Sequence, residues 1–578
     1  MVYRNCLNGI KRVSNNLLAF FLKLLMLPQI FIDKLSFNDG SDLKIGHSDI
    51  IIFTGANNAG KSQVLKDIDL MMESNGNKGL VATFVEMSYV GDIKEREDDF
   101  KSKDGKYRIG GNYFNEFDSI NNWWSNKHRI FTSFYKNRLS TEMRLQASNN
   151  APSFDALYNE PTMPVQMLYL NDKLEEKLSV LFHEAFNEYL IVNRVGGNTI
   201  PIHVGQPPVK DAGEDRVSKG YLDKLRKLPI LQNQGDGMRS FAGILLDVFT
   251  TQKTVTMIDE PEAFLHPPQA RLLGRMFVKN KPNDRQLFIS THSEDFLKGL
   301  LDADSNNVKI VRINRKKDVN HIKVLDNEGV KNLWKDSILR YSNILSGLFH
   351  SKVVICESDT DCRFYQAIMN SIYEAEGKTS PDILFTHCGG KERFKSVIPA
   401  LTALNVKTVV VPDIDVLNEE ATFKTISALL DIKWDDIGGK WKTVFEYVKG
   451  QRAQLNTDEA RTAINEILDG ISTPQMSQDD IEAVKGKLKA STAWSKVKEV
   501  GKYFFSGDAY SKMDELLNVC KSKGMFIVPV GELESFYKPL ASKANHGTKW
   551  VNAVMQKDLA NDPELIAARK FVAEIVAY

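Results

Sequence analysis

The stretch that decides the fold of the first half of this 578-residue chain is Gly55-Ala56-Asn57-Asn58-Ala59-Gly60-Lys61-Ser62. It matches the Walker A pattern, in which a glycine-rich loop connects a strand to the start of a helix. Residues 50–53 form a short apolar run that is typical of a buried parallel strand. Apolar residues also recur at helical spacing after Ser62. The pattern therefore predicts a phosphate-binding loop.

The residues of this loop have expected roles in holding ATP and Mg²⁺. Backbone N–H groups and the dipole of the following helix would surround the phosphate oxygens. Lys61 would reach the β- and γ-phosphates, and the Ser62 hydroxyl would ligate Mg²⁺. The other loop residues expected to line the nucleotide are Gly55, Asn57, Asn58 and Gly60.

Two strands further along the chain are expected to complete the nucleotide site. Residues 254–258 form a buried-strand pattern that ends in Asp259 and Glu260. Asp259 would position Mg²⁺ and its waters, and Glu260 would polarise the attacking water. Another expected strand, residues 286–290, precedes His292. This histidine stands where its side chain could contact the γ-phosphate.

The second half of the chain contains three expected strands, and each of them ends in carboxylates. Residues 352–356 precede Glu357 and Asp361, residues 407–412 precede Asp413 and Asp415, and residues 525–530 precede Glu532 and Glu534. Because ligands of a parallel sheet bind outside the carboxyl ends of its strands, these side chains should converge. Carboxylate oxygens suit Mg²⁺ or Mn²⁺, whereas carboxylates packed together without cations would raise one another's pKa values. The pattern predicts a divalent-metal site.

The composition restricts the environment and the partners of the chain. It has 75 lysines and arginines against 74 aspartates and glutamates, so any DNA-binding surface has to be a local patch. The five cysteines show neither a CxxC pair nor a zinc spacing, which predicts a reduced, cytoplasmic chain. In residues 1–27 an apolar run is interrupted by Lys23 and is followed by no cleavage site. We expect a helical extension there, with no stable insertion into a membrane.

The first motif set resembles that of ABC-type ATPases. Residues 258–267 (IDEPEAFLHP) look like their Walker B and D-loop, and His292 looks like their switch histidine. Residues 235–241 (GDGMRSF) look like their signature motif, with Gly235 where serine is common and Gly237 as a further nucleotide contact. In this class the signature of one protomer closes over ATP held by another. The resemblance therefore implies a homodimer or a larger homo-oligomer.

The second motif set resembles a Toprim domain, with a Glu after its first strand and an Asp-x-Asp after a later one. Residues 387–391 (HCGGK) resemble the glycine turn between them, and residues 531–534 (GELE) resemble the extra acidic element of Toprim nucleases fused to ABC-type ATPases. Ser358 stands where glycine is frequent. The motif order is similar to that of the overcoming-lysogenization-defect (OLD) nuclease family. Members carry a catalytic lysine near the C-terminus, for which Lys570 is the best match and Lys549 the second.

The expected fold class is α/β, with an ABC-type P-loop ATPase domain followed by a Toprim, Rossmann-like domain. The ATPase domain would span residues 28–345 with an inserted helical lobe at 92–219, and the Toprim domain 346–578 with a helical insertion at 422–521. The first insertion interleaves aromatic and basic residues, which can bind single strands, although core packing of a lobe is favoured. The second could shape DNA access, contact a partner or be structural.

We interpret the chain as an ATP-hydrolysing, divalent-metal-dependent DNA endonuclease. In a two-metal scheme the carboxylates after the strands hold the ions, and a lysine neutralises the charge that develops on the phosphate. The family resemblance implies a role in bacterial anti-phage defence, often with a separately encoded component. The alternative is an ATP-dependent DNA sensor or clamp whose Toprim site is not catalytic. Metal-dependent nicking of DNA separates these two functions.

Overall fold

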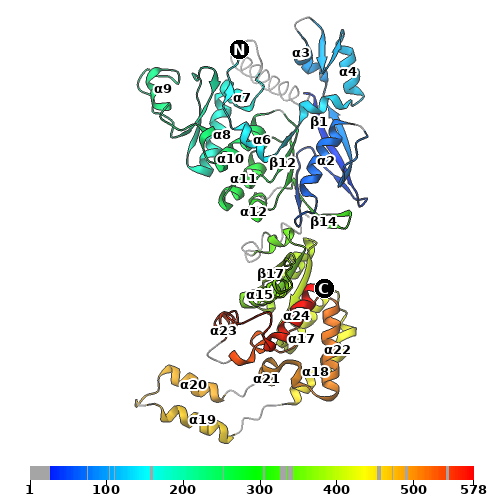
Figure 1. Ribbon diagram of the computed structural model, residues 1–578, viewed down its shortest axis with the longest axis vertical. Helices are drawn as coiled ribbons and strands as arrows, with labels where there is room; N and C mark the ends of the chain where they lie inside the picture. Colours follow the sequence, from blue (N-terminus) through cyan, green and yellow to red (C-terminus); the bar gives the residue numbers. More distant parts are fainter. Residues whose placement is uncertain are drawn as a thin grey trace, which may run out of the picture. The chain divides into compact units, whose positions relative to one another are not determined.

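The computed structural model describes residues 27–74, 76–102, 105–109, 111–156, 161–251, 253–303, 306–325, 334, 343–451, 457–471, 473–488, 493–541 and 546–578. The chain forms two compact units, Met1–Lys335 and Asp336–Tyr578. Each unit is built around its own parallel strands (Figure 1). The helical extension expected at residues 1–27 lies outside the described residues, except for Leu27.

The first unit contains a six-stranded sheet in the order β15-β14-β3-β13-β12-β7. Its strands are β3 (Ile50–Thr54), β7 (Lys136–Leu139), β12 (Val255–Asp259), β13 (Gln286–Ser290), β14 (Val308–Lys316) and β15 (Val319–Val324). All neighbours pair in parallel except β14 and β15. Every residue of β3 and β13 is buried, as expected for parallel strands that are covered on both faces. The strands predicted at residues 50–53, 254–258 and 286–290 are therefore confirmed.

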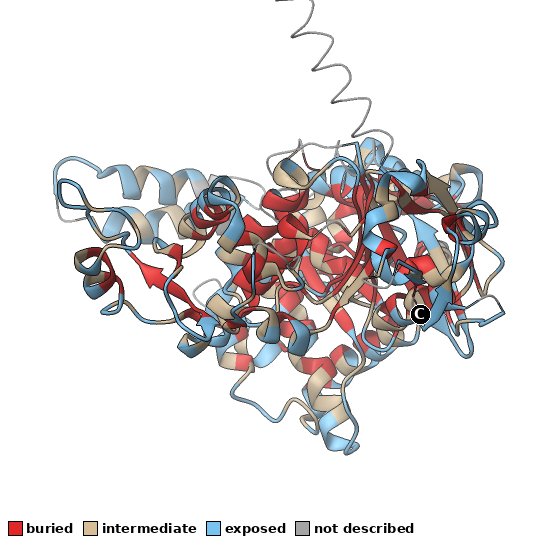
Figure 2. Ribbon diagram, turned by 90° about the horizontal axis from the view of Figure 1, so that it is seen from above, coloured by how far each residue is buried: buried red, intermediate tan, exposed pale blue. Residues whose placement is uncertain are grey.

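Helix α2 (Lys61–Glu73) shares one core with the main sheet and with a second, antiparallel sheet. The antiparallel sheet has the order β2-β1-β4 and consists of β1 (Gln29–Phe37), β2 (Asp42–Lys44) and β4 (Ala82–Val90). Val64 and Ile68 of α2 belong to the same buried cluster as Ile30 of β1 and Phe288 of β13. Figure 2 shows the buried residues gathered on the strands and on the inner faces of the helices. This packing fixes the helix that begins in the Walker A loop.

The range 92–219, expected to be a helical lobe, contains strands as well as helices. Its helices are α3 (Glu97–Phe100), α4 (Phe117–Ser125), α5 (Thr132–Tyr135), α6 (Thr141–Ala147), α7 (Pro164–Leu170) and α8 (Asp172–Phe186), and its further strands are β5 (Tyr107–Ile109), β6 (Asn112–Phe114), β8 (Ala151–Pro152), β9 (Tyr189–Val192), β10 (Thr199–Ile200) and β11 (Ile202–Gly205). Strand β7 pairs with β12 and so covers backbone groups that an unpaired β12 would expose. Trp124, Phe131 and Tyr135 are buried in the core, which agrees with the packing interpretation of this range.

The remaining helices of the first unit are α9 (Lys219–Leu225), α10 (Asp236–Thr250), α11 (Pro267–Asn280) and α12 (Glu294–Asp302). Helices α11 and α12 approach each other closely because each has a glycine at their contact. A Cβ at Gly274 would lie 2.3 Å from the carbonyl oxygen of Phe296, and one at Gly299 would lie 1.9 Å from that of Arg271. Helix α11 follows β12 and α12 follows β13, so this contact fixes the segments that leave the two strands.

The second unit has a parallel sheet of three strands in the order β17-β16-β18. The strands are β16 (Lys352–Cys356), β17 (Ile383–His387) and β18 (Lys407–Val411). The helices around it and after it are α15 (Asp359–Ala375), α16 (Phe394–Ala403), α17 (Glu420–Leu429), α23 (Thr548–Val554) and α24 (Ile566–Ala577). Phe364 of α15 and Phe571 of α24 belong to one buried cluster with Val354 of β16.

The strand expected at residues 525–530 is not formed, although the segment runs beside β18. Val410 donates to the carbonyl of Gly524, Phe526 donates to that of Val410, and Val528 donates to that of Pro412. Continuing this parallel pattern would need an N–H at residue 412. Proline lacks one, and only a single bridge, between Val410 and Met525, is present. The segment still reaches the same end of the sheet as β16 and β18.

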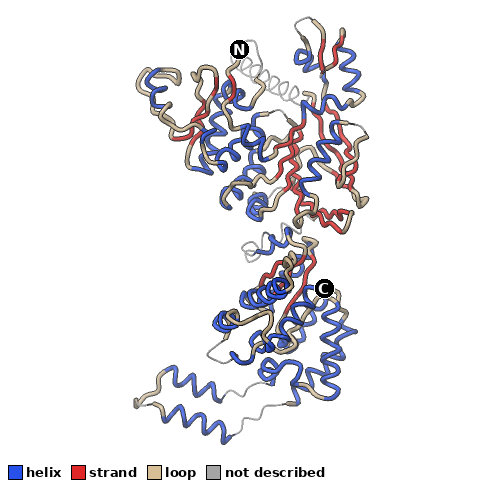
Figure 3. Tube along the Cα trace, viewed as in Figure 1, coloured by secondary structure: helices blue, strands red, loops and turns tan. Residues whose placement is uncertain are grey.

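The insertion at residues 422–521 is helical, as expected (Figure 3). It contains α18 (Trp434–Gly450), α19 (Thr457–Asp469), α20 (Gln478–Leu488), α21 (Ala493–Val500) and α22 (Gly507–Ser522). Ser477 caps α20, since its hydroxyl accepts from the N–H of Asp480 at 3.1 Å. Trp441 anchors α18 by donating to the carbonyl of Leu417 at 2.9 Å.

We predict that Gly299→Ala lowers the stability of the first unit by about 1–3 kcal/mol, because the added methyl group meets backbone that cannot move away freely. Urea unfolding of the purified protein measures this difference. Gly439→Ala is the matched control, because Gly439 is also helical and a Cβ there meets nothing within 4 Å. A Gly299→Ala protein as stable as the wild type would show that the α11–α12 contact is not tight.

Candidate nucleotide and metal sites

The Walker A loop has a conformation that requires glycine at two positions. Gly55 has φ 144° and Gly60 has φ 104°. A Cβ at Gly55 would lie 2.2 Å from the carbonyl oxygen of Ile313, and one at Gly60 would lie 2.9 Å from Asn320 Nδ2. Lys61 is buried, and its ammonium donates to the carbonyls of Gly55 at 2.9 Å and Ala56 at 2.8 Å. The positive charge therefore lies inside the loop.

Residues that are far apart in the sequence converge on the carboxylate of Asp259 at the end of β12. Ser62, at the start of α2, donates its hydroxyl to Asp259 Oδ1 at 2.7 Å. Ser290, at the end of β13, donates to the same oxygen. A serine hydroxyl beside an aspartate at a phosphate-binding loop is the pair that holds Mg²⁺ in P-loop ATPases. Both expected Mg²⁺-binding side chains are thus brought together.

His292 lies beside Glu260. Its Nε2 is 3.7 Å from Glu260 Oε1. Burial, followed by the positive charge of Lys61, lowers the pKa of His292, which favours the neutral ring at neutral pH. Glu260 has φ 48°, a left-handed conformation that is uncommon for a residue with a side chain. Non-glycine residues held in such conformations cluster at functional sites.

Two residues of this site were not singled out from the sequence. The side chain of Arg144 on α6 is fully buried and donates to the carbonyls of Asp259 at 2.5 Å and Glu260 at 3.1 Å. It also donates to the hydroxyl of Ser240 on α10 at 3.2 Å, so it joins the Walker B backbone to the signature helix. Glu262 accepts from the backbone N–H of His292 at 2.8 Å. Glu262 stands within the quoted Walker B motif, whereas no sequence pattern marks Arg144.

The signature stretch begins helix α10, with Gly235 as its N-cap. A Cβ at Gly237 would lie 2.8 Å from the carbonyl oxygen of Phe264, so glycine is needed for this approach. The expected contact of Gly235 and Gly237 with nucleotide stays a prediction.

In the second unit, the ends of β16 and β18 bring Glu357, Asp413 and Asp415 together. One carboxylate oxygen from each lies within 4.8 Å of the others. The backbone N–H of Asp413 donates to Glu357 Oε1 at 3.0 Å, which holds the glutamate at the end of β18. Asp415 Oδ1 is buried and has no hydrogen-bond partner. We call these three residues the strand-end group.

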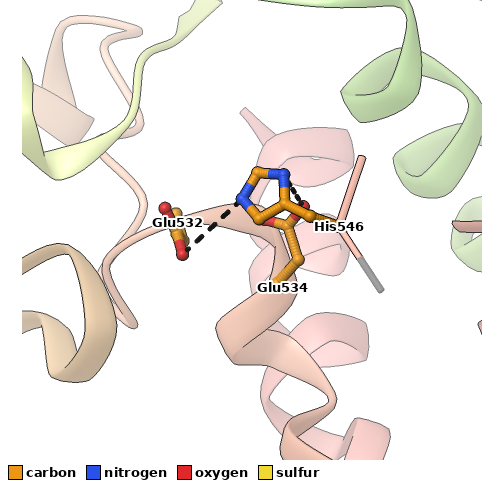
Figure 4. Close-up of side chains that lie close together, drawn as sticks. All are labelled: Glu532, Glu534 and His546. Carbon is orange, nitrogen blue, oxygen red and sulfur yellow. Dashed lines mark ion pairs between the residues drawn. The ribbon is translucent and has the colours of Figure 1, made fainter. Parts of the chain in front are cut away.

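A second group consists of Glu532, Glu534 and His546, and we call it the histidine group (Figure 4). One ligand atom from each lies within 4.8 Å of the others. His546 Nδ1 is 3.1 Å from Glu534 Oε1, and its Nε2 is 4.0 Å from Glu532 Oε1. His546 was not expected from the sequence, because it follows no strand and belongs to no recognisable motif. An imidazole nitrogen suits transition metals such as Mn²⁺ better than Mg²⁺.

Asp361 is beside these groups but has a structural partner of its own. Its Oδ2 accepts from the N–H of Ser358 at 2.9 Å, and the Ser358 hydroxyl accepts from the N–H of Asp361 at 3.4 Å. This reciprocal pair is a capping box at the start of α15. Burial raises the pKa of Asp361, and the charge of Glu534 contributes to the same direction. The expected role as a metal ligand would have to coexist with capping.

Crowding of acidic groups perturbs the titration of the strand-end group. Burial raises the pKa of Glu357 to about 7, and repulsion from Asp415 and Asp361 adds to this effect. Burial also raises the pKa of Asp413, and Glu357 is the next cause. A bound divalent cation would remove the cause of these shifts, because it compensates the negative charge where water is excluded. The donor set therefore fits a divalent metal.

The structure does not bring Lys570 or Lys549 to the carboxylates. Both side chains are exposed, Lys570 on α24 and Lys549 on α23. Helix α24 turns Phe571, Val572 and Ile575 into the core, which leaves Lys570 on its outer face. Among the described residues, neither lysine forms an ion pair with either group. The catalytic lysine expected from the family pattern, at Lys570 or Lys549, therefore stays a prediction.

The cations that do lie at the strand-end group are Lys391 and Lys498. Lys391 Nζ is 3.6 Å from Asp415 Oδ2 and 3.1 Å from Glu419 Oε1. Lys498 Nζ is 3.4 Å from Asp415 Oδ2 and 3.6 Å from Asp413 Oδ2. Lys391 belongs to the glycine turn quoted from the sequence, whereas Lys498 comes from the helical insertion.

Comparison with protein-family models gives two matches that follow one another along the chain. A model described as "AAA domain, putative AbiEii toxin, Type IV TA system" matches residues 50–297. A model described as "Overcoming lysogenization defect protein-like, TOPRIM domain" matches residues 348–415. The second match includes the strand-end group and ends before the histidine group. The expected fold, a P-loop ATPase domain followed by a Toprim domain, is confirmed.

Solved structures similar to part of the chain include heads of Smc proteins. A Smc head bound to the C-winged helix domain of ScpA is 14% identical, with 52% of this chain and 98% of that chain covered and a TM-score of 0.31. The head from Pyrococcus furiosus is 13% identical, with 54% of this chain and 99% of that chain covered and a TM-score of 0.29. The head from Thermotoga maritima is 12% identical, with 51% of this chain and 98% of that chain covered and a TM-score of 0.26. Comparison with curated proteins gives no match. Within the described residues, no helix has the length and apolar character to cross a membrane.

We predict that without divalent metal the second unit loses stability as the pH rises from 4.5, the ordinary pKa of Glu357, to about 7, its folded value. The folded state binds more protons than the unfolded state in this window, so stability decreases with pH. In EDTA, the melting temperature should decrease by ~2 °C or more between pH 5 and pH 7.5. Mn²⁺ should reverse the decrease at pH 7.5, and Glu357→Gln should reduce it. A melting temperature that is independent of both pH and Mn²⁺ would contradict the prediction.

Proposed function

The chain is an ATPase–Toprim fusion of the overcoming-lysogenization-defect family, and from this we propose that it is an ATP-dependent, divalent-metal-dependent DNA endonuclease. The observation that carries the proposal is the convergence of Glu357, Asp413 and Asp415 at the ends of two parallel strands. Such a set of oxygen donors, with one buried oxygen left without a partner, suits a bound divalent cation.

Two neighbouring groups of ligands support a two-metal reaction. When bound, divalent ions supply an activated water and stabilise the leaving oxygen of an in-line displacement. Asp413 and Asp415 hold their carboxylates at the site through the backbone turn after β18, and Glu357 is fixed by the N–H of Asp413. Glu532, Glu534 and His546 would hold the second ion. In hydrolysis the water oxygen bonds to phosphorus, one ester P–O bond breaks, and the leaving oxygen takes a proton.

The nucleotide site supports ATP hydrolysis as the control of this cleavage. Lys61 lies in the loop where it would bind phosphate. Ser62 and Asp259, which are joined by a hydrogen bond, would bind Mg²⁺. Glu260, which lies beside His292, would orient the attacking water. The likeness of residues 235–241 to the signature motif of ABC-type ATPases supports a homodimer, or a larger homo-oligomer, in which each signature completes the partner's site.

The biological setting is proposed from the family. We propose a bacterial anti-phage role in the cytoplasm, with DNA as the substrate and a separately encoded component as a partner. The described cysteines are buried and free, which suits a reducing compartment. The second candidate function is an ATP-dependent DNA sensor or clamp. It is favoured by the lysines that compensate the carboxylates, since a structural charge cluster would also carry such cations.

We predict that Lys61→Ala abolishes ATP binding, and that Glu260→Gln binds ATP but hydrolyses it about 100-fold more slowly, because a neutral amide cannot polarise the water. Fluorescent-nucleotide binding and phosphate release measure the two effects. Lys66→Ala is the matched control, since Lys66 is an exposed lysine on the same helix. Equal turnover by Glu260→Gln and the wild type would remove Glu260 from the site.

We predict that Asp413→Ala and Asp415→Ala each lower cleavage of supercoiled plasmid in Mn²⁺ by at least about 100-fold. Both variants should fold and bind ATP, since the substitutions remove little apolar burial. Asp359→Ala is the control, because this exposed aspartate lies at the start of α15 and pairs with Arg363 at 2.7 Å. Metal-independent cleavage, or undiminished cleavage by both folded variants, would contradict the proposed nuclease site.

A further inference from the structure

The helical insertion of the second unit contains a cavity of about 470 Å³ with aromatic walls. Trp434, Trp441 and Phe445 of α18 line it, and they share one face of the helix because they recur at helical spacing. Helix α18 packs against α17 and α21, and Glu420 of α17 also lines the cavity. The cavity is thus built where the inserted helices meet.

Four aromatic rings form a continuous row from this cavity to α21. The ring centroids of Trp434 and Trp441 are 5.7 Å apart. Phe445 follows at 4.8 Å from Trp441, and Trp494 of α21 at 6.3 Å from Phe445. Trp441 is buried, whereas the other three residues are only partly buried. The row therefore offers ring surface to a ligand, which a closed core would not.

The aromatic row is attached to the strand-end group at two points. Trp441 Nε1 donates to the carbonyl of Leu417 at 2.9 Å, and Leu417 belongs to the same 3-10 helix as Asp415. Trp494 and Lys498 share one face of α21, about 6 Å apart along its axis. Lys498 Nζ is 3.4 Å from Asp415 Oδ2. The cavity and the carboxylates are therefore held by the same elements.

The position of Trp434 at the cavity is fixed by its neighbours. A Cβ at Gly438 would lie 2.7 Å from Trp434 Nε1, so glycine lets the indole lie against the backbone of α18. Lys424 Nζ lies 5.2 Å from the centroid of the Trp434 ring, a distance at which the cation stabilises the ring. Trp434 is thus a preformed wall of the cavity.

The charges around the cavity decide which part of a DNA strand it can hold. Lys442, Lys449, Glu420 and Glu446 line it, and Lys442 Nζ is 3.9 Å from Glu446 Oε1. Balanced charge gives little attraction for a phosphate, whereas aromatic walls suit the flat face of a nucleobase. The faces of a base are covered by its neighbours inside a duplex. A base can therefore enter such a cavity only when it is unpaired or flipped out of the helix.

We propose that the cavity binds an unpaired base of the DNA strand that the strand-end group cleaves, by stacking it against Trp434 and Phe445. The proposal rests on the nuclease function proposed above, and it narrows the substrate to DNA with a single-stranded or flipped-out nucleotide near the cleaved bond. Stacking on aromatic side chains tolerates any sequence, because every base has a flat face. The insertion thus selects DNA by local unpairing.

The first test measures binding of a fluorescent single-stranded oligothymidylate to the full-length protein by anisotropy, in EDTA so that no cleavage occurs. Trp434→Leu and Phe445→Leu remove a ring but keep an apolar side chain. Each should weaken binding about fivefold or more, as expected for the loss of one stacked base. Trp434→Phe keeps a ring and should bind within about threefold of the wild type.

Two controls separate stacking from general effects. Tyr447→Leu is the matched variant, since Tyr447 is a partly buried aromatic residue of the same helix whose ring packs on Phe505, with 5.6 Å between the centroids. It should bind the oligothymidylate as the wild type does. A fully paired hairpin duplex is the second control, and all variants should bind it equally, because its base faces are covered.

The second test asks whether the cavity serves cleavage. In Mn²⁺ the wild type should cleave a duplex with a short unpaired bubble at least about tenfold faster than the same duplex fully paired. Trp434→Leu and Phe445→Leu should lose most of this preference. If neither variant folds, Gly439→Leu decides both tests. Gly439 also lines the cavity, and a Cβ there meets nothing within 4 Å, so leucine narrows the cavity without displacing a neighbour.

Two results would overturn the base-binding cavity. One is oligothymidylate binding by the folded leucine variants within about twofold of the wild type. The other is an equal weakening of oligothymidylate and hairpin binding, which would mean that the rings only support the fold. If the wild type cleaves no DNA, or cleaves it as Asp413→Ala does, the nuclease function fails, and the substrate named here fails with it. If the wild type cleaves and the leucine variants keep its preference for the bubble, only the cavity assignment is wrong.

Discussion

The burial cost of closely packed carboxylates, with their mutual repulsion added, is the constraint on which the second unit depends. The ends of β16 and β18 hold Glu357, Asp413 and Asp415 with oxygens within 4.8 Å of one another. The protein places them there by backbone geometry, because each residue follows a strand whose position is fixed by a buried sheet. Burial, with repulsion from Asp415 and Asp361 added, raises the pKa of Glu357 to about 7, so the charged form of this carboxyl is disfavoured without a cation. Lysines and divalent ions are then alternative means of compensating the same charge.

The nucleotide site of the first unit relies on a different principle, in which one aspartate, Asp259, accepts hydrogen bonds from three directions through its carboxylate and its backbone carbonyl. Ser62 and Ser290 donate to a single oxygen of Asp259, and Arg144 donates to the backbone of the same residue. Arg144 also donates to Ser240 on α10, so the Walker B backbone and the signature helix belong to one hydrogen-bonded network.

Much of the fold and part of the site could be predicted from the sequence. Apolar runs gave the strands β3, β12, β13, β16 and β18, because buried parallel strands are apolar on both faces. The segment after Gly524 was wrongly expected to be a strand, because its apolar pattern is right but its neighbour Pro412 lacks the N–H that the pairing needs. Strand β7 was missed because its sequence, Lys136-Asn137-Arg138-Leu139, has little apolar character.

The parts of the site that could not be predicted come from segments without a strand to position them. His546 and Lys498 reach the carboxylates through tertiary packing, which no local pattern encodes. Lys570 was chosen from its position in the chain, and the core packing of α24 turns it outward. Residues that follow strands are predictable because the sheet fixes their direction, whereas residues delivered by an insertion are not.

The most direct test of the account is anomalous diffraction at the manganese edge from crystals soaked in Mn²⁺. The account predicts one peak among Glu357, Asp413 and Asp415, and a second one among Glu532, Glu534 and His546. Asp413→Ala should remove the first peak and leave the fold unchanged. The absence of both peaks in well-ordered wild-type crystals would contradict the claim that these carboxylates are assembled to bind metal.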